Sequence, residues 1–204
     1  MSNNHPIETH PFGEFLPPNA TALMMGTMPP TQDKWCMAFH YPNFYNDMWR
    51  IYGKVFFDDV DHFRIGDEKR FDADKIKVFL TQKGLGELPS VTQIIREHGN
   101  ASDEHLTVVS TVNLTEALAK VPQVKWLFTT GGKATEVLIE VINATLHEGE
   151  KPHKVPKTNQ AISVTVAGRE LGVYRLPSSS RAYPLKFDKK VEAYRTFFEL
   201  AGLL

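Results

Sequence analysis

The segment 35–49, WCMAFHYPNFYNDMW, holds the side chains of this sequence that are best suited to bind a flat heterocycle. Aromatic rings stand there beside the amides Asn43 and Asn46, in a stretch that a proline keeps from being a regular helix. Stacking one nucleobase on an aromatic face contributes about 1–3 kcal/mol. That offsets most of the few kcal/mol needed to extrude a base from a duplex. Burial in the core is the commoner fate of aromatic residues, so a base-binding loop and a core segment are both open interpretations.

A second candidate for a ligand-binding segment is the bend Gly26–Pro30, which directly follows the apolar run Ala22–Met25. The apolar run predicts a short buried strand. A glycine followed by two prolines ends that strand abruptly. The bend is either a simple turn or a backbone loop that holds a ligand.

The segment 176–184, LPSSSRAYP, places three hydroxyl groups next to a guanidinium. A serine nucleophile is one interpretation, but no glycine flanks Ser178–Ser180 as the nucleophile-elbow pattern requires. A loop whose hydroxyls cap backbone groups is another. A third interpretation gives these hydroxyls and Arg181 a role as donors to a phosphodiester backbone.

The segment TTGGKATE, residues 129–136, is similar to the end of a phosphate-binding P-loop. The full pattern requires a glycine where this chain has Leu127, so the motif is incomplete. Gly131 and Gly132 are sufficient for a tight turn into a helix, whose N-terminus can face an anion.

The composition limits the possible classes of function. The chain has 204 residues, 42% of them apolar, which is sufficient for a full core. Its 23 Lys and Arg against 24 Asp and Glu give a net charge of −1, which argues against binding nucleic acid by charge alone. One cysteine, Cys36, excludes an internal disulfide framework, and eight scattered histidines predict no metal site. No long apolar run is present, so we expect a cytoplasmic protein without membrane contact.

Periodicity predicts strands that alternate with helices. We expect strands at 21–25, 105–113 and 124–130 and a hairpin over 161–177 that turns at Gly168. The expected helices cover 47–57, 72–84, 90–99, a short segment after Thr115, 133–149 and 188–200. This order predicts an α/β fold with a short, mainly parallel four-stranded sheet and helices on both faces. In such sheets ligands bind beyond the carboxyl ends of the strands. Three loops begin at these ends here: GTMPP, TTGGK and LPSSSRAYP. Residues 1–20 are expected to be an irregular lead-in to one domain, 21–204.

Taken in order, these segments resemble the uracil-DNA glycosylase superfamily, and most closely its hypoxanthine/deoxyinosine branch. The resemblance extends over about residues 10–190. It rests on LMMGTMPP, HYPNFYNDMWRIYGKVF, GLGELPSVTQIIREHGNASDEHL, VKWLFTTGGKATEVL and LPSSSRAYP. Each motif alone is weak, but five in the same order are specific.

The resemblance implies a three-layer α/β/α glycosylase of base-excision repair. Such an enzyme removes a deaminated base from DNA and leaves an abasic site, without a metal or an organic cofactor. By position, Gly26–Pro30 match the wall of the base pocket and Asn46 matches the catalytic asparagine. Ser178–Ser180 match the loop that grips the DNA strand, and we add Arg181 and Lys133 as candidate DNA contacts. The expected partner is damaged DNA, bound by a monomer.

The residues also suggest roles of their own. We expect backbone N–H groups within Thr27, Met28, Pro29 and Pro30 to hydrogen-bond the base, and Phe39 or Tyr41 to stack on it. His40 is a candidate proton donor to the departing base, although a structural histidine is the alternative. Asn113 is a second candidate for reading the base edge, or else a turn residue at a strand end.

Two departures from the family pattern leave the chemistry open. Thr27-Met28 stand where well-known members place an Asp or Asn that positions water, and Arg181 stands where the branch has a proline. The chain is therefore either an active glycosylase or a glycosylase-like protein that only binds nucleic acid or a free base. A small-molecule hydrolase that uses Ser178–Ser180 is the third hypothesis.

Overall fold

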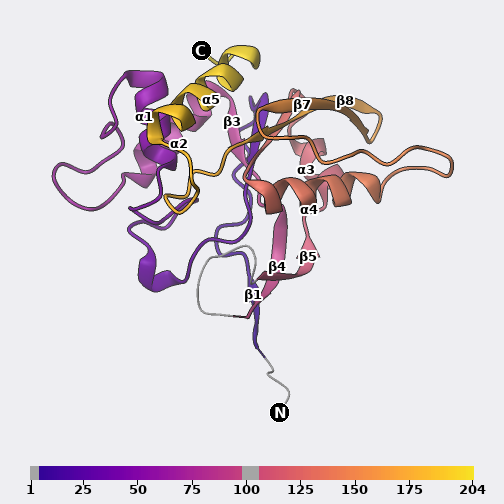
Figure 1. Ribbon diagram of the computed structural model, residues 1–204, viewed down its shortest axis with the longest axis horizontal. Helices are drawn as coiled ribbons and strands as arrows, with labels where there is room; N and C mark the ends of the chain where they lie inside the picture. The colour runs from indigo at the N-terminus through magenta and orange to yellow at the C-terminus, as the bar shows by residue number, and fades with distance from the viewer. Residues whose placement is uncertain (1–4, 98–105) are drawn as a thin grey trace.

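The computed structural model describes residues 5–97 and 106–204. Its central sheet has five strands in the order β3-β2-β6-β8-β7 (Figure 1). The strands are β2 Ala22–Met25, β3 Leu85–Glu87, β6 Trp126–Thr130, β7 Gln160–Val166 and β8 Arg169–Leu176. The first four in spatial order run parallel, and β7 pairs antiparallel with β8. The sheet is therefore mainly parallel, as expected, but it has five strands and not four.

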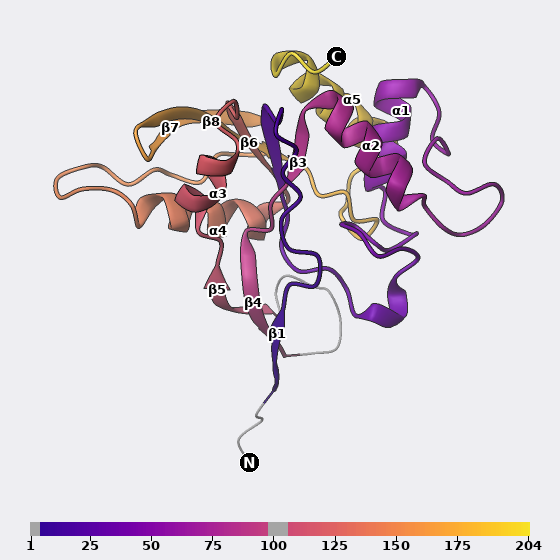
Figure 2. The same ribbon diagram turned by 180° about the vertical axis from the view of Figure 1, so that it is seen from behind.

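Helices cover both faces of this sheet and complete the three layers (Figures 1 and 2). One layer consists of α1 Met48–Phe57, α2 Ala73–Lys83 and α5 Phe187–Leu200. The other consists of α3 Leu114–Lys120 and α4 Gly132–Asn143. Alternate residues of β2 point toward the two helical layers. Met24 packs into the hydrophobic cluster with α1, α2 and α5, and Met25 packs into the cluster with α3 and α4. Both faces of β2 are buried, which explains its uninterrupted apolar run.

A second, antiparallel sheet extends from the main body and has the order β1-β4-β5. It contains β1 Ile7–Thr9, β4 Val91–Arg96 and β5 Leu106–Thr111. The expected helix over 90–99 is therefore wrong as far as Glu97, and its last two residues lie outside the described ranges. The expected strand at 105–113 is confirmed for Leu106–Thr111, but it pairs with β4 in this second sheet. Within the lead-in expected to be irregular, Ile7–Thr9 form a strand.

The error at 90–99 has a physical reason. Ser90 and Gly99 are the start and stop signals of a helix, but Val91, Ile94 and Ile95 are β-branched or apolar residues that also suit a strand. Strands on both sides of β4 supply its hydrogen-bond partners. That tertiary pairing overrides the local capping signals.

Other local signals predicted their elements correctly. The carboxylate of Asp72 accepts hydrogen bonds from the N–H groups of Asp74 and Lys75, at 3.1 and 3.0 Å, and starts α2. Gly84 ends the same helix with a φ of 66°. Gly168, with a φ of 75°, turns the hairpin between β7 and β8.

The close contact between β6 and β8 yields a test of the fold. A Cβ added at Gly172 would lie 2.3 Å from two ring carbons of Trp126 on the paired strand. We therefore expect Gly172→Ala to destabilise the protein by about 1–3 kcal/mol, measured by urea unfolding. Thr165→Ala, at an exposed position of the edge strand β7, is the control and should cost less than about 0.5 kcal/mol. Equal effects of the two changes would contradict this packing.

Candidate functional site

A cavity of about 260 Å³ opens where the parallel strands of the central sheet end. Met25, Glu87, Thr130 and Leu176 are the last residues of β2, β3, β6 and β8, and the cavity is lined by two of them and by the loops that follow. This is the place where open α/β sheets bind ligands. The sequence-predicted residues that line it are Gly26, Thr27, Met28, Pro29, Pro30, His40, Tyr41, Asn46, Ser178, Ser179 and Ser180.

The bend Gly26–Pro30 is held in place by hydrogen bonds to its carbonyl groups. The carbonyl of Gly26 accepts from both the N–H and the hydroxyl of Ser90, each at 2.8 Å. The carbonyl of Pro29 accepts from Arg96 at 3.0 Å, and that of Pro30 from the Trp35 indole at 2.7 Å. Two separate segments of the chain, 90–96 and the loop that contains Trp35, thus fix the wall of the cavity before any ligand binds. Pro29 and Pro30 have no N–H, so the expected backbone donors reduce to those of Thr27 and Met28.

Gly26 also allows a close approach by Tyr41. A Cβ on Gly26 would lie 2.7 Å from the Tyr41 hydroxyl oxygen. That hydroxyl shares a 2.6 Å hydrogen bond with Thr130 at the end of β6. Tyr41 itself has a φ of 52°, a region that side-chain-bearing residues adopt at a cost. The strained residue is therefore part of the cavity wall, where such strain is often found.

Asn46 stands immediately before α1 with part of its amide still available. Its Oδ1 accepts a hydrogen bond from the N–H of Met48 at 2.9 Å, which fixes how the amide is turned. Its own N–H donates to the carbonyl of Asn43 at 2.9 Å. Nδ2 donates to no other residue within the described ranges, so two N–H donors remain for a ligand at the cavity wall.

Two histidines in the wall are uncharged at neutral pH. Burial lowers the pKa of His40 to about 3 and that of His10 to about 4. The rings stack with their centroids 5.6 Å apart, so a charge on either one would be further disfavoured. His40 hydrogen-bonds the backbone of Gly13, and its Nε2 has no partner within the described residues. His40 is therefore a neutral imidazole, and the expected proton donation is limited to what a neutral ring can do.

Glu87 brings a carboxyl group into the same wall. Its side chain is almost completely buried, and its Oε1 has no hydrogen-bond partner among the described residues. Burial raises the pKa of Glu87 well above the usual value of a glutamate, because a charge here would lose its hydration. Burial therefore favours the protonated, neutral form of this carboxyl group, and Glu87 is part of the cavity wall.

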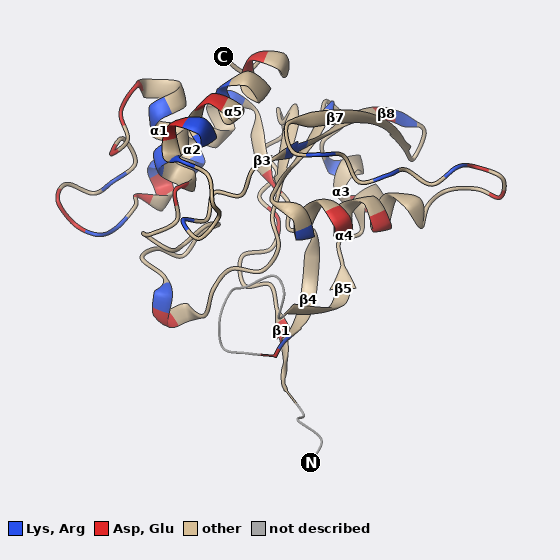
Figure 3. Cartoon of the chain, viewed as in Figure 1, with Lys and Arg blue, Asp and Glu red and all other residues tan. Residues whose placement is uncertain are grey.

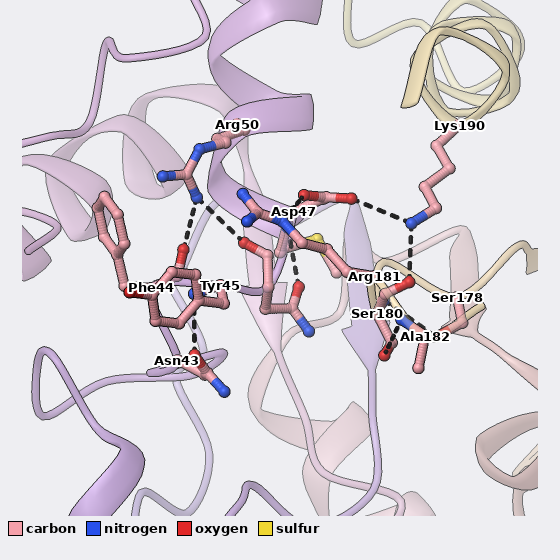
Figure 4. Close-up of polar contacts among 12 residues, drawn as sticks. Asn43, Phe44, Tyr45, Asp47, Arg50, Ser178, Ser180, Arg181, Ala182 and Lys190 are labelled. Atoms are coloured by element: carbon pink, nitrogen blue, oxygen red, sulfur yellow. Dashed lines mark hydrogen bonds and ion pairs between the residues drawn. The ribbon is translucent and has the colours of Figure 1, made fainter. Parts of the chain in front are cut away.

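A buried ion pair connects the serine loop, Ser178–Ser180, to the asparagine loop, which contains Asn43 and Asn46 and ends at Asp47 (Figure 4). Lys190 of α5 donates to Asp47 Oδ2 at 3.1 Å and to the carbonyl of Ser180 at 2.7 Å. Arg181 donates to the other oxygen of Asp47 at 2.8 Å. The N–H of Asp47 donates to the carbonyl of Ser179 at 3.1 Å. These bonds hold Ser178–Ser180 beside the residue that follows Asn46.

The hydroxyl groups of this loop serve the backbone. Ser178 Oγ accepts from the N–H of Ser180, and Ser180 Oγ accepts from the N–H of Ala182, both at 3.2 Å. In the described part of the chain, none of the three hydroxyls is hydrogen-bonded to a histidine or a carboxylate. The arrangement lacks the adjacent base that activates a serine nucleophile, which counts against a serine hydrolase.

Several predicted site residues lie outside the cavity wall. Phe39 is buried in the core, 5.4 Å from the Phe15 ring and 6.2 Å from Trp49, so Tyr41 is the aromatic residue of the pair that faces the cavity. Asn113 caps α3 by accepting from the N–H of Glu116 at 3.1 Å. It therefore caps the helix that follows β5 and does not line the cavity.

The two predicted cationic contacts lie near the rim rather than in the wall. Arg181 is half exposed and packs over the ring of Tyr45 as well as pairing with Asp47. Lys133 lies in the first turn of α4, two residues after Gly131. A Cβ on Gly131 would be 3.5 Å from the Cβ of Ser178, which places the start of α4 against the serine loop.

The sequence analysis gave no individual role to the other residues of the wall, which are His10, Phe12, Lys34, Pro42, Asn43, Glu87, Pro89 and Thr130. For Glu87 a signal was present, because a single carboxylate interrupts the otherwise uncharged run LGELP. His10 and Phe12 carried no such signal, since they stand in a segment without periodicity.

Known proteins support the fold assignment. A search of family models and a search of curated proteins found no match. Among solved structures, the chain is similar to the solution NMR structure of a "putative Uracil DNA glycosylase" from Methanosarcina acetivorans, at 16% identity and a TM-score of 0.65. The match covers 97% of this chain and 99% of that one. The protein therefore has a uracil-DNA glycosylase-like fold.

The described residues form neither a metal-binding cluster nor a membrane-spanning helix. No group of three or more His, Cys, Asp or Glu side chains within them is arranged to hold a metal ion. None of the helices in the described part of the chain is both long and apolar enough to span a bilayer.

The buried pair of Lys190 and Asp47 yields a test of how the site is held together. Lys190→Met leaves Asp47 buried and paired with Arg181 but without the Lys190 ammonium group. We expect the free energy of unfolding, measured in urea, to fall by about 3 kcal/mol. Lys189→Met, at the exposed position next to it, should cause no measurable change. Adding Asp47→Asn to Lys190→Met should recover part of the loss, since no buried charge is then left unpaired. A double variant no more stable than Lys190→Met would contradict this account.

Proposed function

We propose that this protein is a DNA glycosylase that hydrolyses the N-glycosidic bond of a deaminated base, uracil or hypoxanthine, in DNA. The observation that carries the proposal is the convergence of three sequence motifs on one cavity. The bend Gly26–Pro30, the amide of Asn46 and the loop Ser178–Ser180 line it together, at the carboxyl ends of parallel strands. The similarity in fold to the Methanosarcina acetivorans protein supports it.

The cavity suits an extruded base. Its wall combines Tyr41 with Thr27, Met28 and the amide of Asn46. A flat heterocycle gains from an aromatic face and from a few fixed donors along its edge. The wall is fixed in advance by Ser90, so little ordering is required when a base enters.

The proposed reaction adds water across the glycosidic bond. The bond between C1′ of the sugar and the base nitrogen breaks, and its electron pair leaves with the base. Water then forms a bond to C1′ and loses a proton to the surrounding solvent, which leaves an abasic sugar and the free base. Positive charge develops on the sugar and negative charge on the base, so fixed donors toward the base accelerate the step.

Asn46 acts here by position and not as a base. Its amide oxygen is a weak base and already accepts the N–H of Met48. Its free N–H donors can hold the attacking water or an oxygen of the departing base. Holding reactants in one geometry is itself a large contribution to rate.

The rim of the cavity suits the DNA backbone. The serine loop lies beside Arg181, with Lys133 close by at the start of α4. Hydroxyl groups, exposed N–H groups and cations are the usual contacts to phosphate. Figure 3 shows Lys and Arg interspersed with Asp and Glu over the molecule, so DNA contact has to rely on such local groups.

A glycosylase-like protein that binds a base without cleaving it is the second candidate. The observation that favours it is Thr27-Met28, where a water-positioning carboxylate or amide would be expected, while burial raises the pKa of Glu87 in the wall. Alkaline cleavage of duplexes that carry uracil, hypoxanthine or xanthine, after incubation with the protein, distinguishes the two. Strand breaks at the damaged base support the glycosylase.

Asn46 gives the first test of the mechanism. We expect Asn46→Ala to lower the single-turnover release of uracil or hypoxanthine by at least about 100-fold, because a positioned donor is lost. Asn113→Ala is the matched control: it removes an asparagine cap outside the cavity, costs about 1 kcal/mol of stability and leaves excision unchanged. Thermal unfolding shows that both variants are folded. Wild-type turnover by Asn46→Ala would remove this residue from the mechanism.

Arg181 gives a test of the DNA contact. We expect Arg181→Ala to weaken binding to DNA of any sequence and to reduce the slope of log K against log salt by about one. Lys120→Ala serves as the charge-matched control, since Lys120 is half exposed on α3 in the opposite helical layer. A salt slope equal to that of wild type would show that Arg181 meets no phosphate.

A further inference from the structure

Glu87 is unusual because one oxygen of its carboxyl group is buried without a hydrogen-bond partner among the described residues. Its side chain is 1% exposed, and Oε1 accepts and donates no hydrogen bond within the described residues. Its backbone is fixed in both directions by Phe15, through two hydrogen bonds of 2.8 Å. A buried polar group without a partner is costly and calls for an explanation. Here the explanation lies in the cavity, because Glu87 is part of its wall.

The position of Glu87 in the sheet explains why it faces the cavity. Successive residues of β3 point to opposite faces, so Glu87 shares a face with Leu85, which packs into the cluster beneath α1, α2 and α5. Glu87 is the last residue of the strand, and one position further the chain turns into Leu88 and Pro89. The sheet thus ends with a carboxyl group where the other buried positions of this face carry apolar side chains.

No charged group close to Glu87 within the described residues counteracts the effect of burial on its pKa. The titratable groups that face it or share its cavity are Tyr52 of α1, Tyr194 of α5, Tyr41, His10, His40 and Lys34. Burial raises the pKa values of Tyr52 and Tyr194 and lowers those of the two histidines, so these four are neutral at pH 7. Lys34 is exposed. No cation in the described part of the chain contributes to the pKa of Glu87, which burial alone raises.

We propose that Glu87 is a base-binding catalytic residue of this cavity. Its carboxylic acid donates a hydrogen bond to a carbonyl oxygen of the extruded base and accepts one from the adjacent ring N–H. This inference rests on the proposed glycosylase function and adds a residue that neither the sequence motifs nor the comparisons assign.

The chemistry of the two partners fits. Uracil and hypoxanthine each present a carbonyl oxygen next to a ring N–H, and a carboxylic acid presents an O–H next to a C=O. Two parallel hydrogen bonds satisfy both oxygens of Glu87. As the glycosidic bond breaks, the electron pair moves onto the base and its carbonyl oxygen becomes more negative. The O–H donor then binds more strongly, while Glu87 keeps its proton throughout.

The test uses a matched pair of variants. Glu87→Gln keeps one donor and one acceptor at nearly the same positions, whereas Glu87→Met keeps the length and removes both. For single-turnover excision we expect Glu87→Met to be about 100- to 1,000-fold slower than wild type, and Glu87→Gln to stay within about ten-fold. Excision by Glu87→Met at the wild-type rate would overturn the inference.

A pH profile separates a base-binding role from a merely structural one. In the wild type, excision should fall on the alkaline side as Glu87 loses its proton, and this fall should be missing in Glu87→Gln. A fall of the same size in both proteins would overturn the assignment.

Unfolding by urea provides a measurement that does not depend on activity. The folded-state pKa of Glu87 is raised above its unfolded value. The stability linked to its proton is therefore complete below the unfolded pKa and is lost as the pH rises toward the folded pKa. The urea midpoint of Glu87→Gln should accordingly rise relative to the midpoint of wild type as the pH increases from 5 to 8. A constant difference over this range would show that Glu87 is not held neutral.

The outcome for the wild type distinguishes this inference from the proposed function. Excision by wild type and by Glu87→Met alike would overturn the role of Glu87 and leave the glycosylase intact. Binding of free uracil or hypoxanthine that Glu87→Met loses, without any excision by wild type, would support the role of Glu87 and overturn the glycosylase. Absence of both excision and base binding in wild type would overturn both.

Discussion

The buried ion pair between Asp47 and Lys190 is the interaction on which the geometry of the site depends. Asp47 follows Asn46 directly, and Lys190 belongs to the last helix of the chain. The same Lys190 also binds the carbonyl of Ser180. One ammonium group thus connects the asparagine loop, the serine loop and α5, which are far apart in sequence. Because a buried charge without its partner is strongly unfavourable, the three segments hold one another in a single arrangement.

The bend Gly26–Pro30 is fixed by a different part of the fold. Ser90, just before β4, and Arg96, at its end, hold the carbonyl groups of Gly26 and Pro29. Arg96 is in turn paired with Glu8 of β1. The small antiparallel sheet therefore braces the wall of the cavity. This gives the second sheet a function in the site, although it contributes no strand to the central one.

The cavity between these two supports is polar but carries little charge. Burial raises the pKa of Glu87 and lowers the pKa values of His10 and His40, so it favours the neutral form of each, and the amide of Asn46 carries no charge. Such a wall can bind an uncharged base without a large desolvation penalty. Its donors become more effective when negative charge develops on the base, because the surroundings have a low dielectric constant. The proposed chemistry therefore relies on fixed dipoles and not on a charged side chain.

The sequence by itself determined the class of the fold and most of the wall of the cavity. The apolar run Ala22–Met25 and the Asp72 cap are local signals, and local signals were sufficient for β2 and α2. The order of the loops identified Gly26–Pro30 and Ser178–Ser180, because loops after parallel strands gather at one edge of a sheet. Asn46 was identified through the resemblance to the glycosylase superfamily. Only the tertiary structure decided that 91–96 is a strand, since its hydrogen-bond partners come from Ile7–Thr9 and Leu106–Thr111. Likewise, Phe39 enters the core while Tyr41 faces the cavity, and the charge of Glu87 depends on what buries it. Burial and long-range pairing are properties of the assembled chain, and no short stretch of sequence contains them.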